Sequence, residues 1–150
     1  MATWADLEAA APKIAAKGRE LLYRNGDGEG MLVTAGADSP PRVHPVNVGV
    51  VDGHLYTFVQ PKSGKAHDLA TDGRYALHTH YDPQAPHEFL LRGRAQLVDD
   101  KATRDAIAAN WFFNAKDYPL YELEIEHALH GERPTADDWP PVYSSWPPRG

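Results

Sequence analysis

Residues 55–77 read LYTFVQPKSGKAHDLATDGRYAL, and this segment predicts a strand, a short helix and a second strand in that order. Its two ends are rich in aromatic and large apolar side chains, which favour strands. Between them, Ser63 is a typical helix N-cap and Gly73 a typical helix terminator. We therefore expect a helix that begins directly after a strand, with free N–H groups at its N-terminus available to a ligand.

Alternating apolar residues on both sides extend this unit into a mostly β domain. A Gly-rich turn at residues 25–30 separates it from a helical stretch at the N-terminus. We expect helices at residues 4–24, broken near Ala11 by Pro12, and at residues 100–114. The expected strands are residues 31–35, 42–51, 54–59, 75–81, 88–98 and 121–130. This order predicts a mainly β fold with flanking helices, a small and partly open β-barrel.

Length, charge and composition restrict the function classes. The 150 residues suffice for one domain and carry a net charge of −6 with histidine neutral, which argues against broad binding to nucleic acid or to an anionic membrane. The sequence contains no cysteine, so disulfides, thiolate-bound metals and a cysteine nucleophile are excluded. No segment approaches the roughly 20 apolar residues that cross a bilayer. We expect a cytoplasmic protein.

The segment QPKSGKAHDL, residues 60–69, is a candidate phosphate site. Lys62, Ser63 and Lys65 surround Gly64 where the helix is expected to begin, so two ammonium groups, a hydroxyl and helix N–H groups converge. The alternative is a simple serine cap with solvated lysines. The segment does not satisfy the G-x-x-x-x-G-K-[ST] pattern of a Walker A loop.

The segment PRVHPVNVGVV, residues 41–51, is a candidate wall for a planar ligand. Pro45 cannot donate to a β-ladder, so this strand should lie at an edge or bulge and leave backbone groups free. Asn47 supplies a side-chain amide, and Gly49 permits close approach, both of which suit a ring with polar edges. The alternative is an edge strand that proline protects against aggregation.

Residues 78–89, HTHYDPQAPHEF, are rich in histidine. His78 and His80 fall on one face of a predicted strand, and His87 and Glu88 follow after a turn, so a histidine–carboxylate metal site is one interpretation. Strand histidines commonly just pack or hydrogen-bond, and the spacing is not distinctive, so we assign no metal. No G-x-S-x-G motif supports a serine hydrolase.

The composition changes from residue 131 onward, where five prolines accompany Trp139, Tyr143 and Trp146. Proline disfavours regular structure, yet the aromatic residues are too apolar for a solvated tail. We therefore divide the chain into a barrel domain at residues 1–130 and an extended arm at residues 131–150. The arm is expected to dock on the barrel or on a partner subunit.

Three segments, in order, resemble the pyridoxamine 5'-phosphate oxidase-like family, split β-barrel flavoproteins that bind FMN or, in some branches, coenzyme F420. They are GMLVTAGADSPPRVHPVNV at residues 30–48, LYTFVQPKSGKAHDLATDGRYAL at 55–77 and FLLRGRAQLVDD at 89–100. The resemblance covers most of residues 20–115 and implies a split β-barrel of the FMN-binding type. The family's true oxidases end in an R-L-x-P segment, whereas this chain ends in WPPRG, so we do not expect a role in vitamin B6 synthesis.

Carried over position by position, the resemblance implies two sets of cofactor-binding residues. The set around the isoalloxazine ring is His44, Pro45, Val46, Asn47, Thr57 and Phe58. The set around the FMN phosphate is Lys62, Ser63 and Lys65. The resemblance also implies a homodimer with two cofactor sites at the subunit interface, where the aromatic arm would serve as a cover.

These observations favour a homodimeric FMN-binding oxidoreductase that transfers hydride through the flavin to a small substrate. If a proton donor is needed, His44, His80 and Tyr81 are candidates by type; no catalytic residue is assigned. Coenzyme F420 on the same fold is one alternative. A flavin or haem carrier without turnover is a second, with histidines as ligands. A metal-dependent β-barrel enzyme is the third.

Overall fold

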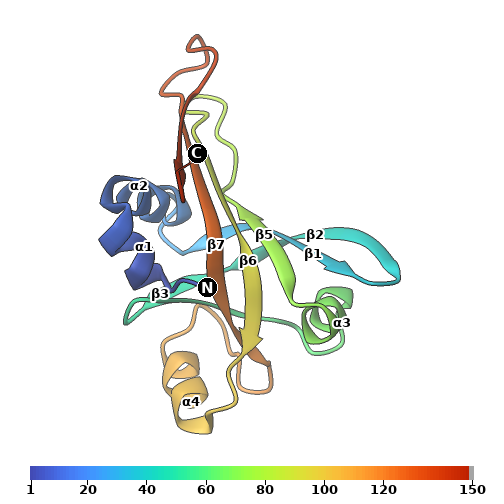
Figure 1. Ribbon diagram of the computed structural model, residues 1–150. Helices are drawn as coiled ribbons and strands as arrows, with labels where there is room; N and C mark the ends of the chain where they lie inside the picture. Colours follow the sequence, from blue (N-terminus) through green and yellow to red (C-terminus); the bar gives the residue numbers. More distant parts are fainter. Residues whose placement is uncertain (149–150) are drawn as a thin grey trace.

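The strands of this protein form one antiparallel sheet that curls into half a barrel, as Figure 1 shows for the computed structural model, which describes residues 1–148. The helices of these residues are α1 (Trp4–Ala10), α2 (Pro12–Leu22), α3 (Gly64–Thr71) and α4 (Lys101–Ala109). The strands are β1 (Glu29–Gly36), β2 (Ser39–Asn47), β3 (Gly49–Val51), β4 (His54–Phe58), β5 (Arg74–His78), β6 (Glu88–Leu97), β7 (Leu120–Glu132) and β8 (Val142–Trp146). The expected mainly β fold with flanking helices is confirmed.

The strand order within the described residues is β2-β1-β5-β6-β7-β4-β3, with β8 paired to β7. β2 lies at one edge, as the position of Pro45 predicts. The single strand expected at residues 42–51 is wrong, because the chain changes partners at Val48. β2 pairs with β1, whereas β3 pairs with β4, and the Val48 N–H donates instead to the Gly28 carbonyl at 3.0 Å.

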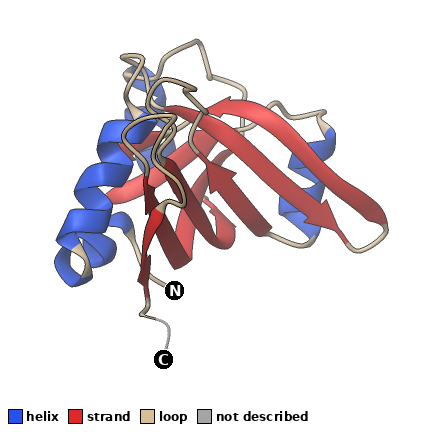
Figure 2. Cartoon of the chain, turned by 90° about the horizontal axis from the view of Figure 1, so that it is seen from above, coloured by secondary structure: helices blue, strands red, loops and turns tan. Residues whose placement is uncertain are grey.

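The N-terminal helices cover one face of the sheet, while α3 lies beneath the β1–β2 hairpin on the other side (Figure 2). The break predicted near Ala11 is confirmed: α1 ends at Ala10 and Pro12 occupies the first turn of α2, where its missing N–H costs nothing. Thr3 caps α1 in a capping box with Asp6. The buried stripe of α1 and α2 packs into the main core with Leu55, Phe89, Leu123 and other strand residues.

Gly18 lets α2 approach the ring of Phe89 on β6, and we expect alanine there to destabilise the fold. A Cβ at residue 18 would lie 2.2–2.7 Å from three ring atoms of the fully buried Phe89. Overpacking of this kind costs about 1–3 kcal/mol, set against about 1 kcal/mol from alanine's better helix propensity. Urea unfolding should show that Gly18→Ala lowers the free energy of unfolding. The same substitution should lower it by less when it is made in a Phe89→Leu background. A Gly18→Ala variant as stable as wild type would contradict this packing.

The segment after β6 differs from expectation in the length of its helix. α4 begins where expected, with Asp100 as its N-cap, but ends at Ala109 rather than near residue 114. Beyond it, Trp111 packs edge-on against Phe58 with ring centroids 5.0 Å apart. These side chains belong to a second apolar cluster, which includes Tyr56, Phe58, Ile107, Ala115 and Leu120.

The C-terminal segment contains more regular structure than its prolines suggest. The scarcity of regular structure expected from residue 131 onward does not hold for Val142–Trp146, which form β8 and pair antiparallel with the end of β7. Trp146 is half-buried and packs against the main core, so this segment docks on its own barrel. Residues 149–150 of the predicted arm lie outside the described residues. Among the described residues, none of the helices has the length and hydropathy that a bilayer crossing requires.

Candidate functional site

Helix α3 begins as predicted, with Ser63 as its N-cap. The Ser63 hydroxyl accepts the Ala66 N–H at 3.2 Å and donates to the Gln60 carbonyl at 2.7 Å. Its donor and acceptor roles are thus used to hold the loop before α3 against the first helical turn. Ser63 therefore positions the start of α3, where the helix dipole presents partial positive charge.

An arginine that sequence reasoning missed lies over this helical turn. Arg42 on β2 extends its guanidinium across Gly64, and a Cβ at Gly64 would lie only 2.7 Å from the guanidinium carbon. Arg42 Nε donates to Asp68 Oδ2 at 3.1 Å, which fixes the side chain in this position. The glycine in Ser63-Gly64-Lys65 therefore makes room for a cation from another strand. Its small size was the only sequence signal of this contact.

Asp68 joins the β1–β2 hairpin to α3. Its side chain is fully buried and accepts hydrogen bonds from Thr34 at 2.8 Å and from Ser39 at 3.2 Å, in addition to Arg42. Burial opposes ionisation, but these hydrogen bonds and the guanidinium charge together hold the pKa of Asp68 below its ordinary value. The carboxylate is thus ionised at neutral pH and keeps Arg42 in place.

Lys65 adds a second cation to Arg42 near the α3 N-terminus, and the His44 imidazole lies under the influence of both. Burial lowers the pKa of the Lys65 ammonium from its ordinary value. Burial lowers the pKa of His44 as well, and the charges of Lys65 and Arg42 add to this effect. The His44 imidazole is therefore kept neutral beside two cations, a setting that favours an anionic ligand.

A cavity of about 400 Å³ opens beside this region, within the usual size of small-molecule pockets. Five of the nine predicted cofactor-binding residues line it: Pro45, Val46, Asn47, Phe58 and Lys65. Five more lining residues were not among those nine: Glu29, Gln60, His80, Phe113 and Tyr118. The strand and the lysine that sequence reasoning singled out separately thus meet in one pocket.

The other predicted cofactor-binding residues do not line this cavity. Thr57 is fully buried, and its hydroxyl donates to the Asn47 carbonyl at 2.9 Å, so it supports the pocket wall from behind. His44 is half-buried on β2, and Lys62 is exposed. Ser63 serves as the cap of α3.

The wall opposite β2 comes from the segment after α4. Phe113 and Tyr118 form an aromatic pair with ring centroids 5.5 Å apart. Arg104 on α4 fixes this segment, because its guanidinium donates to the backbone carbonyls of Ala115 at 2.9 Å and of Tyr118 at 3.1 Å. Periodicity offered no signal for this wall, since these residues lie about fifty positions beyond Lys65 and are brought there by tertiary packing.

Glu29 and His80 supply polar groups to the same cavity. His80 Nε2 lies 3.9 Å from Glu29 Oε2, and Asn25 donates to the other oxygen of Glu29. His78 does not line the pocket; its Nδ1 pairs with the Thr79 carbonyl at 2.6 Å. The two histidines therefore have different surroundings. Among the described residues, the one group of side chains with metal-ligand spacing contains neither His78 nor His80, so a metal site that joins them to His87 finds no support.

Comparisons with known proteins identify the fold. No family model and no curated protein sequence matches this chain. Solved structures do match it. A protein from Listeria innocua that carries the name pyridoxamine 5'-phosphate oxidase has a TM-score of 0.59 at 18% identity, covering 75% of this chain and 94% of that one. HutZ from Vibrio cholerae, named as a heme storage protein, has a TM-score of 0.59 at 17% identity, covering 74% and 89%.

A heme-binding protein from Mycobacterium smegmatis also matches, with a TM-score of 0.59 at 19% identity over 83% of this chain. This chain spans only 55% of the length of that protein. Identities this low establish a shared fold and nothing beyond it. The curled antiparallel sheet with flanking helices is therefore the split β-barrel of the pyridoxamine 5'-phosphate oxidase-like proteins.

Proposed function

We propose that this chain is an FMN-binding oxidoreductase. The observation that carries the proposal is that a single cavity joins Lys65, in the first turn of α3, to the Pro45–Asn47 stretch of an edge strand and to an aromatic wall. A phosphate at one end and a planar ring at the other would meet complementary groups in this arrangement.

The phosphate end fits the chemistry of FMN. Lys65 lines the cavity, and Arg42 crosses the same helical turn over Gly64. The guanidinium is already held by Asp68, so its orientation would cost little ordering when a phosphate binds. Ser63 holds the loop that carries Gln60, whose side chain also lines the cavity.

The ring end fits as well. Asn47 donates Nδ2 to the Gly28 carbonyl at 3.1 Å, which fixes the amide and leaves its oxygen available to a ring N–H. Phe58, Phe113 and Tyr118 supply aromatic surface that would exclude water from a bound ring. When bound, FMN would supply hydride transfer to or from a small substrate. Of the three proton-donor candidates, His80 lines the cavity, whereas His44 and Tyr81 do not.

Two other ligands remain alternatives on the same fold. Coenzyme F420 carries a longer and more acidic tail, which would need a larger basic groove than the one lysine that lines this cavity among the described residues. Haem is the other alternative, for a carrier without turnover. His80 supports it, because an imidazole that lines the cavity is a possible axial ligand, and two structural neighbours are named for heme binding or storage.

We further propose that the protein acts in the cytoplasm as a homodimer. The lack of cysteine suits a reducing compartment, although it does not require one. Val43 on the edge strand β2 is 57% exposed, and Phe113 is partly exposed beside the cavity, so apolar surface is available for a second copy near the site. Sedimentation equilibrium of the purified chain tests this assembly.

A ligand titration tests the proposed function. The cofactor-stripped protein is titrated separately with FMN, with F420 and with hemin, following ligand fluorescence for the first two and the Soret band for the third. We expect FMN to bind at one molecule per chain and more tightly than F420. We also expect bound FMN to be reduced by NADH or NADPH, and hemin to give no sharp Soret shift.

The alternatives predict distinct results. Preferential F420 binding would keep the pocket but reject FMN as its ligand. A sharp Soret shift that disappears in His80→Ala, combined with weak FMN binding, would identify a haem carrier. FMN binding without reduction by any nicotinamide or reduced partner would reject the oxidoreductase and leave a flavin carrier.

A further inference from the structure

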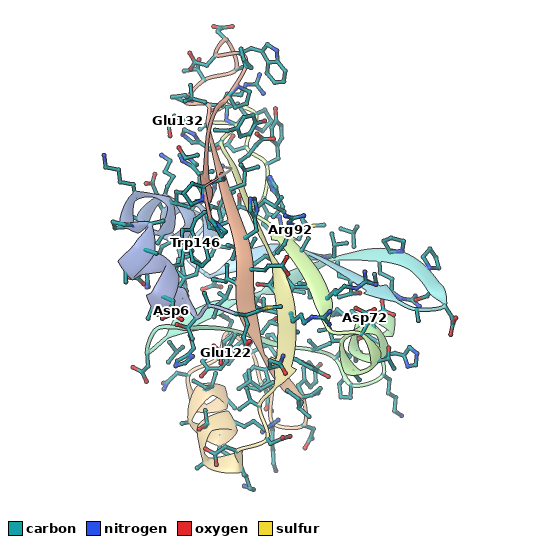
Figure 3. All side chains as sticks on the ribbon, in the orientation of Figure 1. Asp6, Asp72, Arg92, Glu122, Glu132 and Trp146 are labelled. Carbon is teal, nitrogen blue, oxygen red and sulfur yellow. The ribbon has the colours of Figure 1, made fainter. Side chains whose placement is uncertain are left out.

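A second cluster of ligand-type side chains lies away from the pocket, where β6 begins and β7 ends. It consists of His87, which directly precedes β6, and His130 and Glu132 on β7. The antiparallel pairing of β6 and β7, with Glu88 opposite Gly131, brings these residues together. One ligand atom from each lies within 4.8 Å of the others. Figure 3 labels Glu132 at the end of β7 from which the chain continues toward β8.

His130 has a buried ring nitrogen without a hydrogen-bond partner inside this cluster. The residue is 9% exposed, and its Nε2 atom is buried without a hydrogen bond to any described residue. Buried polar atoms are almost always partnered, so an unpartnered one calls for a physical explanation. His130 Nε2 lies 3.3 Å from a carboxylate oxygen of Glu132, so its nitrogen is aimed at the centre of the cluster.

His87 lies beside the same carboxylate, and its Nδ1 lone pair is taken by a backbone N–H. Its Nδ1 atom accepts the Arg133 N–H at 2.9 Å, which means that this nitrogen carries no proton. The same Nδ1 lies 3.8 Å from Glu132 Oε2. A metal ion at His87 Nδ1 would therefore have to displace the Arg133 N–H from this lone pair.

We propose that His87 Nδ1, His130 Nε2 and the Glu132 carboxylate bind one divalent transition-metal ion such as Zn²⁺. Two imidazoles and one carboxylate are a known three-ligand set for zinc, with water as the fourth ligand. Ligands at 2.0–2.1 Å from a tetrahedral ion lie about 3.4 Å apart, close to the 3.3 and 3.8 Å separations here. Magnesium and calcium prefer six or more oxygen ligands, whereas this cluster offers two imidazole nitrogens and a single carboxylate.

The surrounding charges permit a cation. Lys17 and Glu20 on α2 both act on His130, but they form an ion pair with each other at 3.6 Å and largely cancel. The Arg133 guanidinium is turned away and bonds the Ala136 and Asp138 carbonyls. A bound ion would connect the start of β6 to the end of β7 at the residue that leads into the loop before β8. It would thereby stabilise the position at which the C-terminal segment leaves β7.

Metal titration of the full chain tests this proposal. The protein, purified without a histidine tag and freed of metal by a chelator, is titrated with Zn²⁺ by calorimetry, and Co²⁺ is used as a spectroscopic probe of the ligand field. We expect one Zn²⁺ per chain. His130→Gln and Glu132→Gln should each weaken binding by at least about 100-fold, because loss of an outer partner alone costs 10- to 100-fold.

His54→Gln is the matched control. His54 Nδ1 lies 2.7 Å from Glu122 Oε2 in a pair outside this cluster, so its loss should leave Zn²⁺ affinity unchanged. Should His130→Gln fail to fold, Glu132→Gln decides, since the Glu132 side chain is 44% exposed and tolerates the change. Equal Zn²⁺ affinity in wild type and Glu132→Gln, or no stoichiometric binding by wild type, overturns the proposal. Neither result depends on whether the protein binds FMN.

Discussion

Replacing Lys65 by alanine is expected to weaken FMN binding by about 10- to 150-fold, the equivalent of a charge-assisted hydrogen bond of about 1.5–3 kcal/mol. Lys65 lines the cavity at the α3 N-terminus, and burial lowers the pKa of its ammonium. Because the ammonium is partly shielded from water, an ion pair with the phosphate is stronger than it would be on the open surface. The measurement is a fluorescence titration of the cofactor-stripped variant. Riboflavin, which lacks the phosphate, should bind wild type and Lys65→Ala equally well.

Lys62→Ala is the matched control for this experiment. Lys62 is exposed and does not line the cavity, so its loss should change FMN affinity by less than about twofold. An unchanged FMN affinity in Lys65→Ala would reject the phosphate site at α3. A parallel loss of riboflavin affinity would instead mean that the substitution disturbs the pocket as a whole.

Asp68→Asn should produce the largest loss of stability among single changes near the site. The carboxylate is fully buried and accepts hydrogen bonds from Thr34, Ser39 and Arg42, and breaking such an arrangement costs about 2–4 kcal/mol. Urea unfolding at neutral pH measures this loss. FMN affinity should fall as well, because Arg42 loses the partner that holds it over Gly64.

The same substitution should remove part of the pH dependence of stability. The pKa of Asp68 is lowered in the folded protein, so its contribution is fully present above the ordinary value of 3.8 and is lost as the pH falls through the lower folded-state pKa. The difference in unfolding free energy between wild type and Asp68→Asn should therefore shrink in strong acid.

Ser39→Ala removes only one of the hydrogen bonds to Asp68 and should lower the free energy of unfolding by about 0.5–1.5 kcal/mol. An Asp68→Asn variant as stable as wild type at pH 7 would contradict this account of the buried carboxylate.

Local chemistry made part of the fold predictable. Ser63 and Gly73 bound α3 because caps act through neighbouring backbone groups, and these are visible in sequence. Pro45 identified an edge strand because its missing N–H is a property of the residue itself. The junction between β4 and α3, where the cavity lies, followed from the same reasoning.

Contacts between distant segments were not predictable. The Arg42–Asp68 ion pair joins residues 26 positions apart, and neither residue has a pattern that names the other. The strand expected at residues 42–51 is divided at Val48, because its first part pairs with β1 and its last part with β4. Which strand each part pairs with is decided by the folded sheet and has no local signal in the sequence. β8 likewise forms because β7 offers an unpaired edge, which outweighs the low strand preference of the flanking prolines.

The guanidinium of Arg104 has a consequence for how such a protein can diversify. It fastens the segment carrying Phe113 and Tyr118 through backbone carbonyls, so the attachment is indifferent to the side chains in between. The opposite wall and its cations belong to β2, β4 and α3. Substitutions of the exposed, cavity-lining Phe113 can therefore reshape what the cavity accepts while the anion-binding half stays intact. The residues that select the ligand and the residues that anchor its phosphate therefore lie on separate segments of the chain, so substitutions in one segment need not affect the other.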